Sequence, residues 1–235
     1  MNLNTCASNG CIQQLINANS RGHNWTKELS LCEYAAENGH LNCLRYLHEH
    51  GCPWDENVCC MAVINGHLDC LQYLNEHGCP WNNTCTDHAA AFGHLDCLQY
   101  LHEYGCPWNN SVCYNAATNG YLDCLQYAYE HGCICKEWTC VFAAKNGHLH
   151  CLQYLHEHGC PWDKHTCSAA SENGHLHCLQ YAHEHGCPWD ENTSNYAINN
   201  NHTSCLQYAK DNGCALNIHY EKPKFGIVSN RFDAW

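Results

Sequence analysis

Basic residues are scarce in this chain. Of its 235 amino acids only 10 are lysine or arginine, against 23 aspartate or glutamate, and the formal net charge is -13. Binding to DNA or RNA relies on cationic side chains that displace counterions from phosphates. We therefore expect that no nucleic acid is the main partner.

Long apolar runs are absent as well. No stretch approaches the roughly 20 apolar residues of a membrane-spanning helix, and the segment from Met1 to Cys6 has neither the basic flank nor the apolar run of a secretion signal. Charged residues make up 14% of the chain and hydrophobic ones 45%, so the chain can bury a core and does not have the composition of disorder. We expect a folded, cytoplasmic protein without a membrane partner.

Catalytic motifs are missing too. The sequence contains no phosphate-binding loop, no G-x-S-x-G and no H-E-x-x-H. An active site is a single constellation of a nucleophile, a base and an orienting group, whereas nearly every reactive side chain here recurs periodically. We predict that the protein is not an enzyme and carries no cofactor.

What the chain does contain is a repeat of 27 residues. A glycine marks the same phase in six successive units, and the next unit has Asn201 there. Gly10 begins a degenerate copy 29 residues before Gly39. We therefore expect a degenerate N-terminal capping repeat in residues 1–29, a core array in 30–200, a polar C-terminal capping helix in 201–217 and a non-repeat tail in 218–235. The six glycines are Gly39, Gly66, Gly93, Gly120, Gly147 and Gly174.

Each unit predicts two helices. Leu68, Leu71 and Leu74 have the spacing of one helical face, and Gly78 ends that helix. A Cys-Pro-Trp connection follows, and then a second helix that we expect to be the shorter of the two. Its N-cap is expected three residues after the tryptophan position. The expected cap residues are Ser30, Asn57, Thr84, Ser111 and Asn192.

Neither helix is expected to be stable alone, because isolated helices below ~12–15 residues are marginal in water. Stacked units can bury each other's faces, as in a solenoid. We predict one buried ladder formed by a leucine that recurs in every unit. Its members are Leu44, Leu71, Leu98, Leu125, Leu152, Leu179 and Leu206.

The run Ala35-Ala36-Glu37-Asn38-Gly39-His40-Leu41, followed by Gly51, resembles the ankyrin repeat, and the resemblance covers about residues 5 to 217. The ankyrin period is 33 residues, and the six residues missing here fall where ankyrin units project a β-hairpin finger. The resemblance thus implies an all-α solenoid of stacked helix-turn-helix repeats without fingers. It also implies a non-catalytic scaffold that binds a partner protein.

The short variant with Gly-His-Leu-Asp-Cys-Leu-Gln-Tyr and Cys-Pro-Trp is similar to ankyrin-type proteins encoded by giant DNA viruses of amoebae, and by some algae and protists. For a viral chain the resemblance implies a host protein as partner and the host cell cytoplasm as location.

Cysteine and histidine follow the repeat. Of the 24 cysteines, 19 fall at three fixed phases, which favours reduced thiols that pack as small hydrophobes. The histidines after the turn glycine, such as His40 and His67, are expected to hydrogen-bond a neighbouring turn. A second set near the helix end includes His48, four residues before Cys52, a spacing that can share a metal. A thiol- and imidazole-rich metal-binding or redox-buffering protein is therefore the alternative function.

One copy departs from the pattern. Cys133-Ile134-Cys135 replaces Cys-Pro-Trp, and Trp138 stands at the expected N-cap position. We expect Trp138 to fill the volume left by the missing tryptophan; a hinge or a thiol site is the alternative.

The copies differ most at three positions of the first helix in each unit: the two after its first cysteine position and the one before Asn-Gly. These positions are expected to form an outward stripe that binds the partner; the alternative is a merely solvated face. The predicted partner-binding residues are Tyr34, Glu37, Met61, Ile64, His88, Tyr114, Thr118, Phe142, Lys145, Glu172 and Tyr196.

Overall fold

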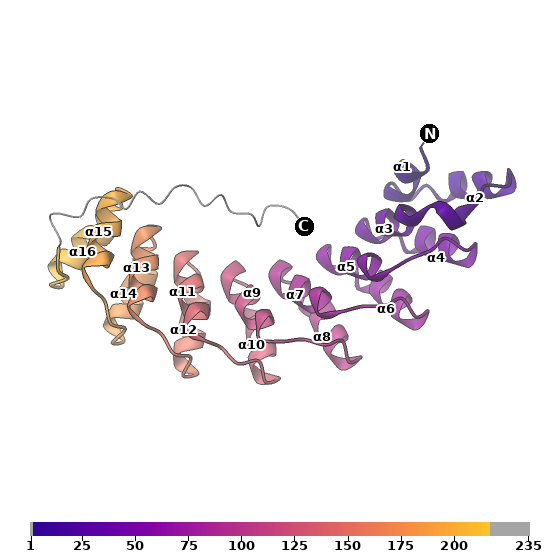
Figure 1. Ribbon diagram of the computed structural model, residues 1–235. Coiled ribbons are helices and arrows are strands. Elements are labelled where there is room, and N and C mark those ends of the chain that lie inside the picture. The colour runs from indigo at the N-terminus through magenta and orange to yellow at the C-terminus, as the bar shows by residue number, and fades with distance from the viewer. Residues whose placement is uncertain (1, 217–235) are drawn as a thin grey trace.

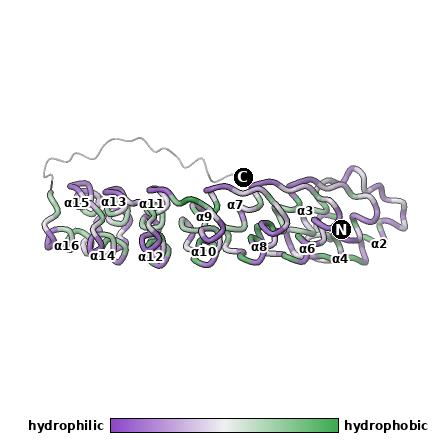
Figure 2. The backbone as a smooth tube through the Cα atoms, turned by 90° about the horizontal axis from the view of Figure 1, so that it is seen from below, coloured by the Kyte–Doolittle hydropathy of each residue, from purple (hydrophilic) through white to green (hydrophobic). Residues whose placement is uncertain are grey.

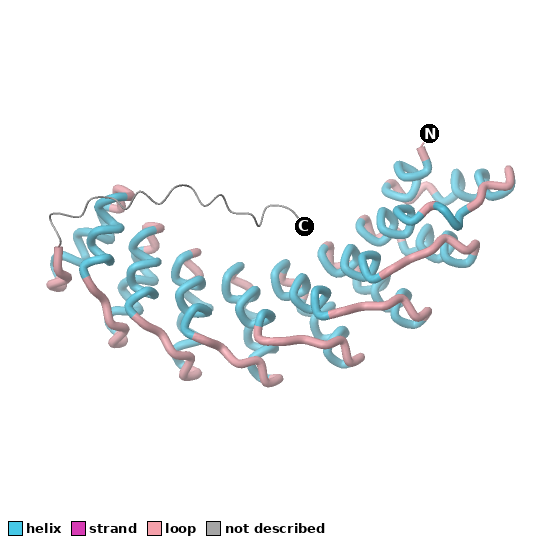
Figure 3. The backbone as a smooth tube through the Cα atoms, viewed as in Figure 1, coloured by secondary structure: helices cyan, strands magenta, loops and turns pink. Residues whose placement is uncertain are grey.

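The computed structural model describes residues 2–216, and this range forms one curved row of helix pairs without any strand (Figures 1 and 3). The expectation of an all-α solenoid without fingers is confirmed. The elements are α1 (Leu3–Ser8), α2 (Ile12–Ser20), the 3-10 helix η1 (Trp25–Lys27), α3 (Leu29–Glu37), α4 (Leu41–Glu49), α5 (Glu56–Ile64), α6 (Leu68–Glu76), α7 (Asn83–Phe92), α8 (Leu95–Glu103), α9 (Ser111–Asn119), α10 (Leu122–Glu130), α11 (Glu137–Lys145), α12 (Leu149–Glu157), α13 (Lys164–Glu172), α14 (Leu176–Glu184), α15 (Glu191–Asn199) and α16 (Thr203–Asp211).

We call the odd-numbered helices α3 to α15 the first helices, and the even-numbered helices α4 to α16 the second helices. Both kinds have nine residues, except α7 with ten, so the expectation of a shorter first helix is wrong. First helices of neighbouring repeats contact one another more extensively than second helices do. The row therefore curves with the first helices on its concave side (Figure 1). Hydrophilic segments recur at the turns along the row (Figure 2).

The N-caps of the first helices lie two residues earlier than predicted. The side chain of Asp55, directly after Trp54, accepts a hydrogen bond from the backbone N–H of Asn57 at 3.0 Å. Asn82, Asp163 and Asp190 cap α7, α13 and α15 in the same way. Aspartate and asparagine are strong N-caps because their short side chains accept from a free backbone N–H two or three residues on. The residues named as caps from the sequence therefore lie inside the first turn.

The leucine ladder forms as predicted in the interior of the row. Leu44, Leu71, Leu98, Leu125, Leu152 and Leu179 are fully buried, and Leu15 occupies the same position in the first helix pair. Leu206 in α16 is only half-buried, because the described part of the chain has no further helix pair to cover it.

The turn glycine between the two helices of a unit meets the histidine of the next unit. Nε2 of His94 donates to the backbone carbonyl of Ile64 at 3.0 Å, and His40 and His67 bond Ser8 and Glu37 in the same way. The predicted hydrogen bond to a neighbouring turn is thus confirmed for these three. Gly66 has a φ of +71°, and a Cβ built there would lie 2.5 Å from Nδ1 of His94. Asn201, which replaces this glycine in the last unit, also has a left-handed φ of 61°.

The cysteine of each Cys-Pro-Trp connection bonds the preceding connection. Its thiol donates to the backbone carbonyl of the residue 24 positions earlier, as in Cys79 to Asp55 at 3.2 Å and Cys106 to Asn82 at 3.2 Å. Burial raises the pKa of Cys106 to about 12, so its thiol keeps the proton that it donates. All 24 cysteines are free thiols, and this ladder gives their reduced state a structural role.

A second ladder joins the second helices. Nδ1 of His102 and the hydroxyl of Tyr127 in the next unit are 2.9 Å apart, and the imidazole stacks on Trp108 with the ring centres 4.0 Å apart. Burial and then the neighbouring His131 imidazole lower the pKa of His102. Asn75 occupies the same position in its unit and donates to the hydroxyl of Tyr100 at 3.0 Å. The equivalent histidine pairs are His48–Tyr73, His156–Tyr181 and His183–Tyr208.

The ladder predicts the cost of a core truncation. Replacing Leu125 by Ala should lower the free energy of unfolding by roughly 2–5 kcal/mol, because it removes a fully buried side chain and leaves a cavity. L206A is the matched control and should cost less, since Leu206 is half-buried. Urea unfolding followed by circular dichroism measures both, and equal losses would contradict the assignment of the ladder.

The two turn glycines of a unit should differ in their tolerance of alanine. G66A and G78A both force alanine into a left-handed conformation, which costs about 1–2 kcal/mol. G66A also drives Cβ against His94, and overpacking adds about 1–3 kcal/mol, whereas no atom lies within 4 Å of the Cβ position at Gly78. Thermal unfolding of the two variants should therefore rank G66A as the less stable one.

The second-helix ladder predicts a loss of stability in acid. The pKa values of His48, His102 and His156 are lowered in the folded chain, while an unfolded histidine titrates near ~6.5. As pH falls through that value the unfolded chain takes up more protons, so the folded state loses stability. The melting temperature should fall between about pH 7 and 5 by less in an H48N/H102N/H156N variant, because asparagine keeps the bond to tyrosine without titrating. An unchanged fall would contradict this account.

Candidate protein-binding face

The predicted partner-binding residues lie along the first helices, which line the concave side of the row (Figure 1). Three of the eleven are exposed, namely Glu37, Lys145 and Glu172. The other eight are half-buried: Tyr34, Met61, Ile64, His88, Tyr114, Thr118, Phe142 and Tyr196. Half-burial leaves part of each side chain available for contact while the rest packs on a neighbouring helix.

The expectation that all three variable positions face outward is wrong for the first of them. Cys60, Ser168 and Asn195 occupy this position in their units and are buried. Asp87, at the same position in α7, accepts a hydrogen bond from the hydroxyl of Ser111 in α9, and burial raises the pKa of this carboxyl. The position packs between neighbouring first helices because these helices approach each other closely on the concave side.

The structure brings three of the predicted residues together. The rings of Tyr114 in α9 and Phe142 in α11 meet edge to face with their centres 5.2 Å apart. Nζ of Lys145 lies 5.6 Å from the centre of the Phe142 ring, a cation–π geometry. Because Tyr114 and Phe142 pack on each other across two repeats, they contribute to the stacking of α9 and α11 as well as to the surface.

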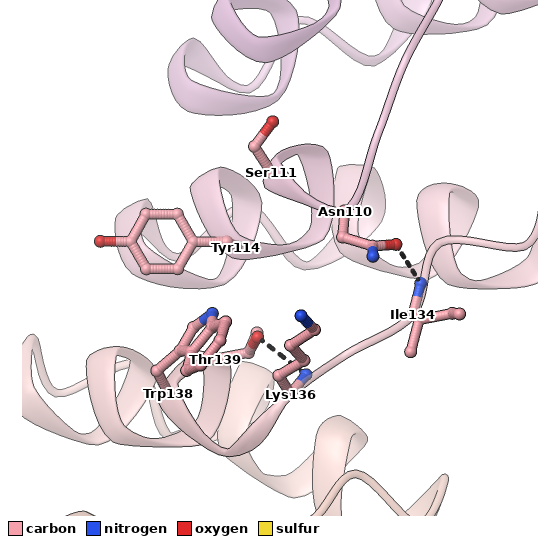
Figure 4. Close-up of a pocket in the computed structure, with 7 residues that line it drawn as sticks. All are labelled: Asn110, Ser111, Tyr114, Ile134, Lys136, Trp138 and Thr139. Carbon is pink, nitrogen blue, oxygen red and sulfur yellow. Dashed lines mark hydrogen bonds between the residues drawn. The ribbon is translucent and has the colours of Figure 1, made fainter.

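Beside this group lies a hollow of about 280 Å³ between α9 and α11 (Figure 4). Two exposed apolar side chains at its wall, Ile134 and Trp138, are 65% and 50% exposed. Nζ of Lys136 lies 4.9 Å from the centre of the Trp138 ring. The residues around the hollow are Asn110, Ser111, Tyr114, Ile134, Lys136, Trp138 and Thr139.

The hollow occurs where the repeat departs from its pattern, and it corrects the expectation for Trp138. The indole stands half in solvent and does not fill the volume of the missing tryptophan. Cys135 is buried at the tryptophan position. Sequence reasoning missed Ile134, Lys136 and Trp138 as surface residues; the broken Cys-Pro-Trp motif was the available signal, because a residue released from a repeated packing role becomes free for contact.

Two further observations concern other kinds of site. Among residues 2–216, no three histidine, cysteine, aspartate or glutamate side chains converge to hold a metal ion. None of the described helices is long and apolar enough to cross a membrane.

The comparisons with known proteins agree with the geometry. The family described as ankyrin repeats (3 copies) matches residues 3–87, 34–112 and 86–166, which together make up more than half of the chain. The chain belongs to the ankyrin-repeat family. Ankyrin repeats generally mediate protein–protein interaction, and the family is typically a non-enzymatic scaffold.

A solved ankyrin-repeat structure shows the same fold. The crystal structure of the human ASB11 ankyrin repeat domain matches with a TM-score of 0.59 at 19% sequence identity, and the alignment covers 67% of this chain and 84% of that one. At this identity the likeness concerns the fold alone. No curated protein matches the chain significantly.

Proposed function

We propose that this ankyrin-repeat protein is a non-catalytic scaffold that binds a partner protein through the concave face of its first helices. The observation that carries the proposal is the exposed apolar group around the α9–α11 hollow, where Ile134 and Trp138 are at least half exposed. Large exposed aromatic side chains beside a hollow are typical of the anchors that dominate protein interfaces.

The charges around the hollow favour a particular kind of partner surface. Lys136 lies on Trp138 and Lys145 on Phe142, and these are two of only ten basic residues in a chain of net charge -13. A partner segment that combines apolar side chains with carboxylates matches this surface. In a viral setting the partner is a host protein met in the host cell cytoplasm.

The ends of the row support its use as one continuous surface. The pair α1 and α2 packs on α3 and α4, which fits an N-terminal capping repeat. At the other end α16 leaves Leu206 half-buried, and its exposed polar residues fit a capping helix in residues 201–217. The non-repeat tail, residues 218–235, lies outside the described residues. The metal-binding alternative gains no supporting observation from residues 2–216.

The proposal predicts which aromatic residue matters for binding. With a partner isolated from the native host by cross-linking and mass spectrometry, W138A should weaken binding by about 2 kcal/mol or more. The melting temperature should stay close to that of the wild type, because half of the indole surface is exposed. Calorimetric titration measures the affinity.

The matched control is Y104A at the end of α8, which removes another exposed aromatic side chain, 59% exposed and away from the first helices. Y104A should leave the affinity unchanged. An affinity that survives W138A but falls in Y104A would place the partner on the second helices and contradict the proposal.

A further inference from the structure

Five of the 24 cysteines fall outside the three periodic phases: Cys6, Cys11, Cys60, Cys85 and Cys135. Two of these five meet. Sγ of Cys60 in α5 and Sγ of Cys85 in α7 are 2.9 Å apart across the junction between two repeats. Both side chains are buried, at 6% and 0% exposure. The pair belongs neither to the thiol ladder of the connections nor to the α9–α11 hollow.

The register of the repeats shows why these two thiols meet. Cys85 lies 25 residues after Cys60, two short of the period, so they come from different positions on neighbouring first helices and face each other across the junction. Cysteines at equivalent positions, such as Cys70 and Cys97, are displaced by a whole repeat instead. The same two positions at the other junctions hold Glu33 and Val58, Asp87 and Val112, Tyr114 and Thr139, Val141 and Thr166, and Ser168 and Thr193. The thiol pair is therefore particular to the α5–α7 junction among these six.

The surroundings of the pair favour thiol chemistry. Oγ1 of Thr84 lies 3.3 Å from Sγ of Cys60. His88 follows Thr84 by one turn of α7, and within residues 2–216 its Nδ1 is buried without a hydrogen-bond partner. Hydrogen bonding from Cys85, and then from His88 and Thr84, lowers the pKa of Cys60, while the same contact raises that of Cys85. A thiolate is the reactive form of cysteine, so the two thiols have different roles.

We propose that Cys60 and Cys85 form a redox-sensitive pair that closes to a disulfide between α5 and α7 when a peroxide oxidises the protein. The Cys60 thiolate attacks one peroxide oxygen, the O–O bond breaks, and one water leaves after protonation. Cys60 then carries a sulfenic acid. The Cys85 sulfur attacks the Cys60 sulfur, the S–O bond breaks and a second water leaves. Two thiols and one peroxide thus give one disulfide and two waters, with two electrons passing from sulfur to oxygen.

The geometry makes the second step intramolecular. The sulfur atoms stand 2.9 Å apart and need to approach to the ~2.05 Å of a disulfide bond. His88, at a position that holds Asn115 in the next-but-one first helix, accepts the proton that the Cys60 thiol gives up. The new bond joins two first helices covalently and so holds the concave side at this junction; a glutathione-type thiol reverses it.

The test uses the full chain, reduced, freed of reductant and treated with one equivalent of hydrogen peroxide at neutral pH. Free thiols are then alkylated and disulfides mapped by mass spectrometry of non-reduced peptides. We expect the loss of two of the 24 alkylatable thiols, recovered as one peptide that links Cys60 to Cys85 and restored by dithiothreitol. This measurement needs no variant, so it does not depend on whether a substitution folds.

Variants separate the two roles. In C85S, Cys60 should remain as a sulfenic acid that dimedone traps, and H88N should slow the loss of the Cys60 thiol while leaving its partner unchanged. C113S, which removes another buried first-helix thiol, should leave the Cys60–Cys85 link intact. The proposal is overturned if another pair closes first, or if Cys60 and Cys85 stay alkylatable while other thiols are lost. An H88N rate equal to that of the wild type would remove His88 from the reaction.

Discussion

The structure depends on burial between neighbouring repeats. Helices of nine residues are too short to persist alone in water, so each pair is stable only because the next pair covers its apolar face. The leucine ladder supplies this burial from Leu15 to Leu179. Where the next pair is missing, at Leu206, the side chain is half-buried. Stability in such a row is a sum of contacts between neighbours.

Three polar ladders fix how the neighbours stack. Histidine to carbonyl, thiol to carbonyl and histidine to tyrosine each join equivalent positions of adjacent repeats, as at His94, Cys79 and His102. Apolar contact is non-directional, so it brings the helix pairs together without setting their register. Hydrogen bonds to named atoms do set it. The binding face proposed for the concave side inherits its regular spacing from these bonds.

Much of this architecture could be predicted from the sequence, because a strict period repeats one environment many times. The helix pairs, the left-handed glycines and the buried leucines all follow from the spacing of residues. Periodicity does not say which neighbour a variable position faces. For this reason Cys60 was expected on the surface although it is buried against α7. Trp138 was expected in the core although it is half exposed, since a residue at a broken motif has no equivalent from which to infer its place.

The fixed separation of the bonded positions has a consequence for how the gene can change. Each thiol of the connections reaches back 24 residues and each ladder tyrosine pairs 25 residues back, so removal or duplication of one 27-residue unit rejoins donors and acceptors of the same kind. The row can therefore gain or lose units by unequal recombination without breaking its stacking bonds. Features that occur at one junction, such as the Trp138 hollow, cannot be restored from a neighbouring unit once lost. Selection on length and selection on recognition thus act on separate parts of the chain.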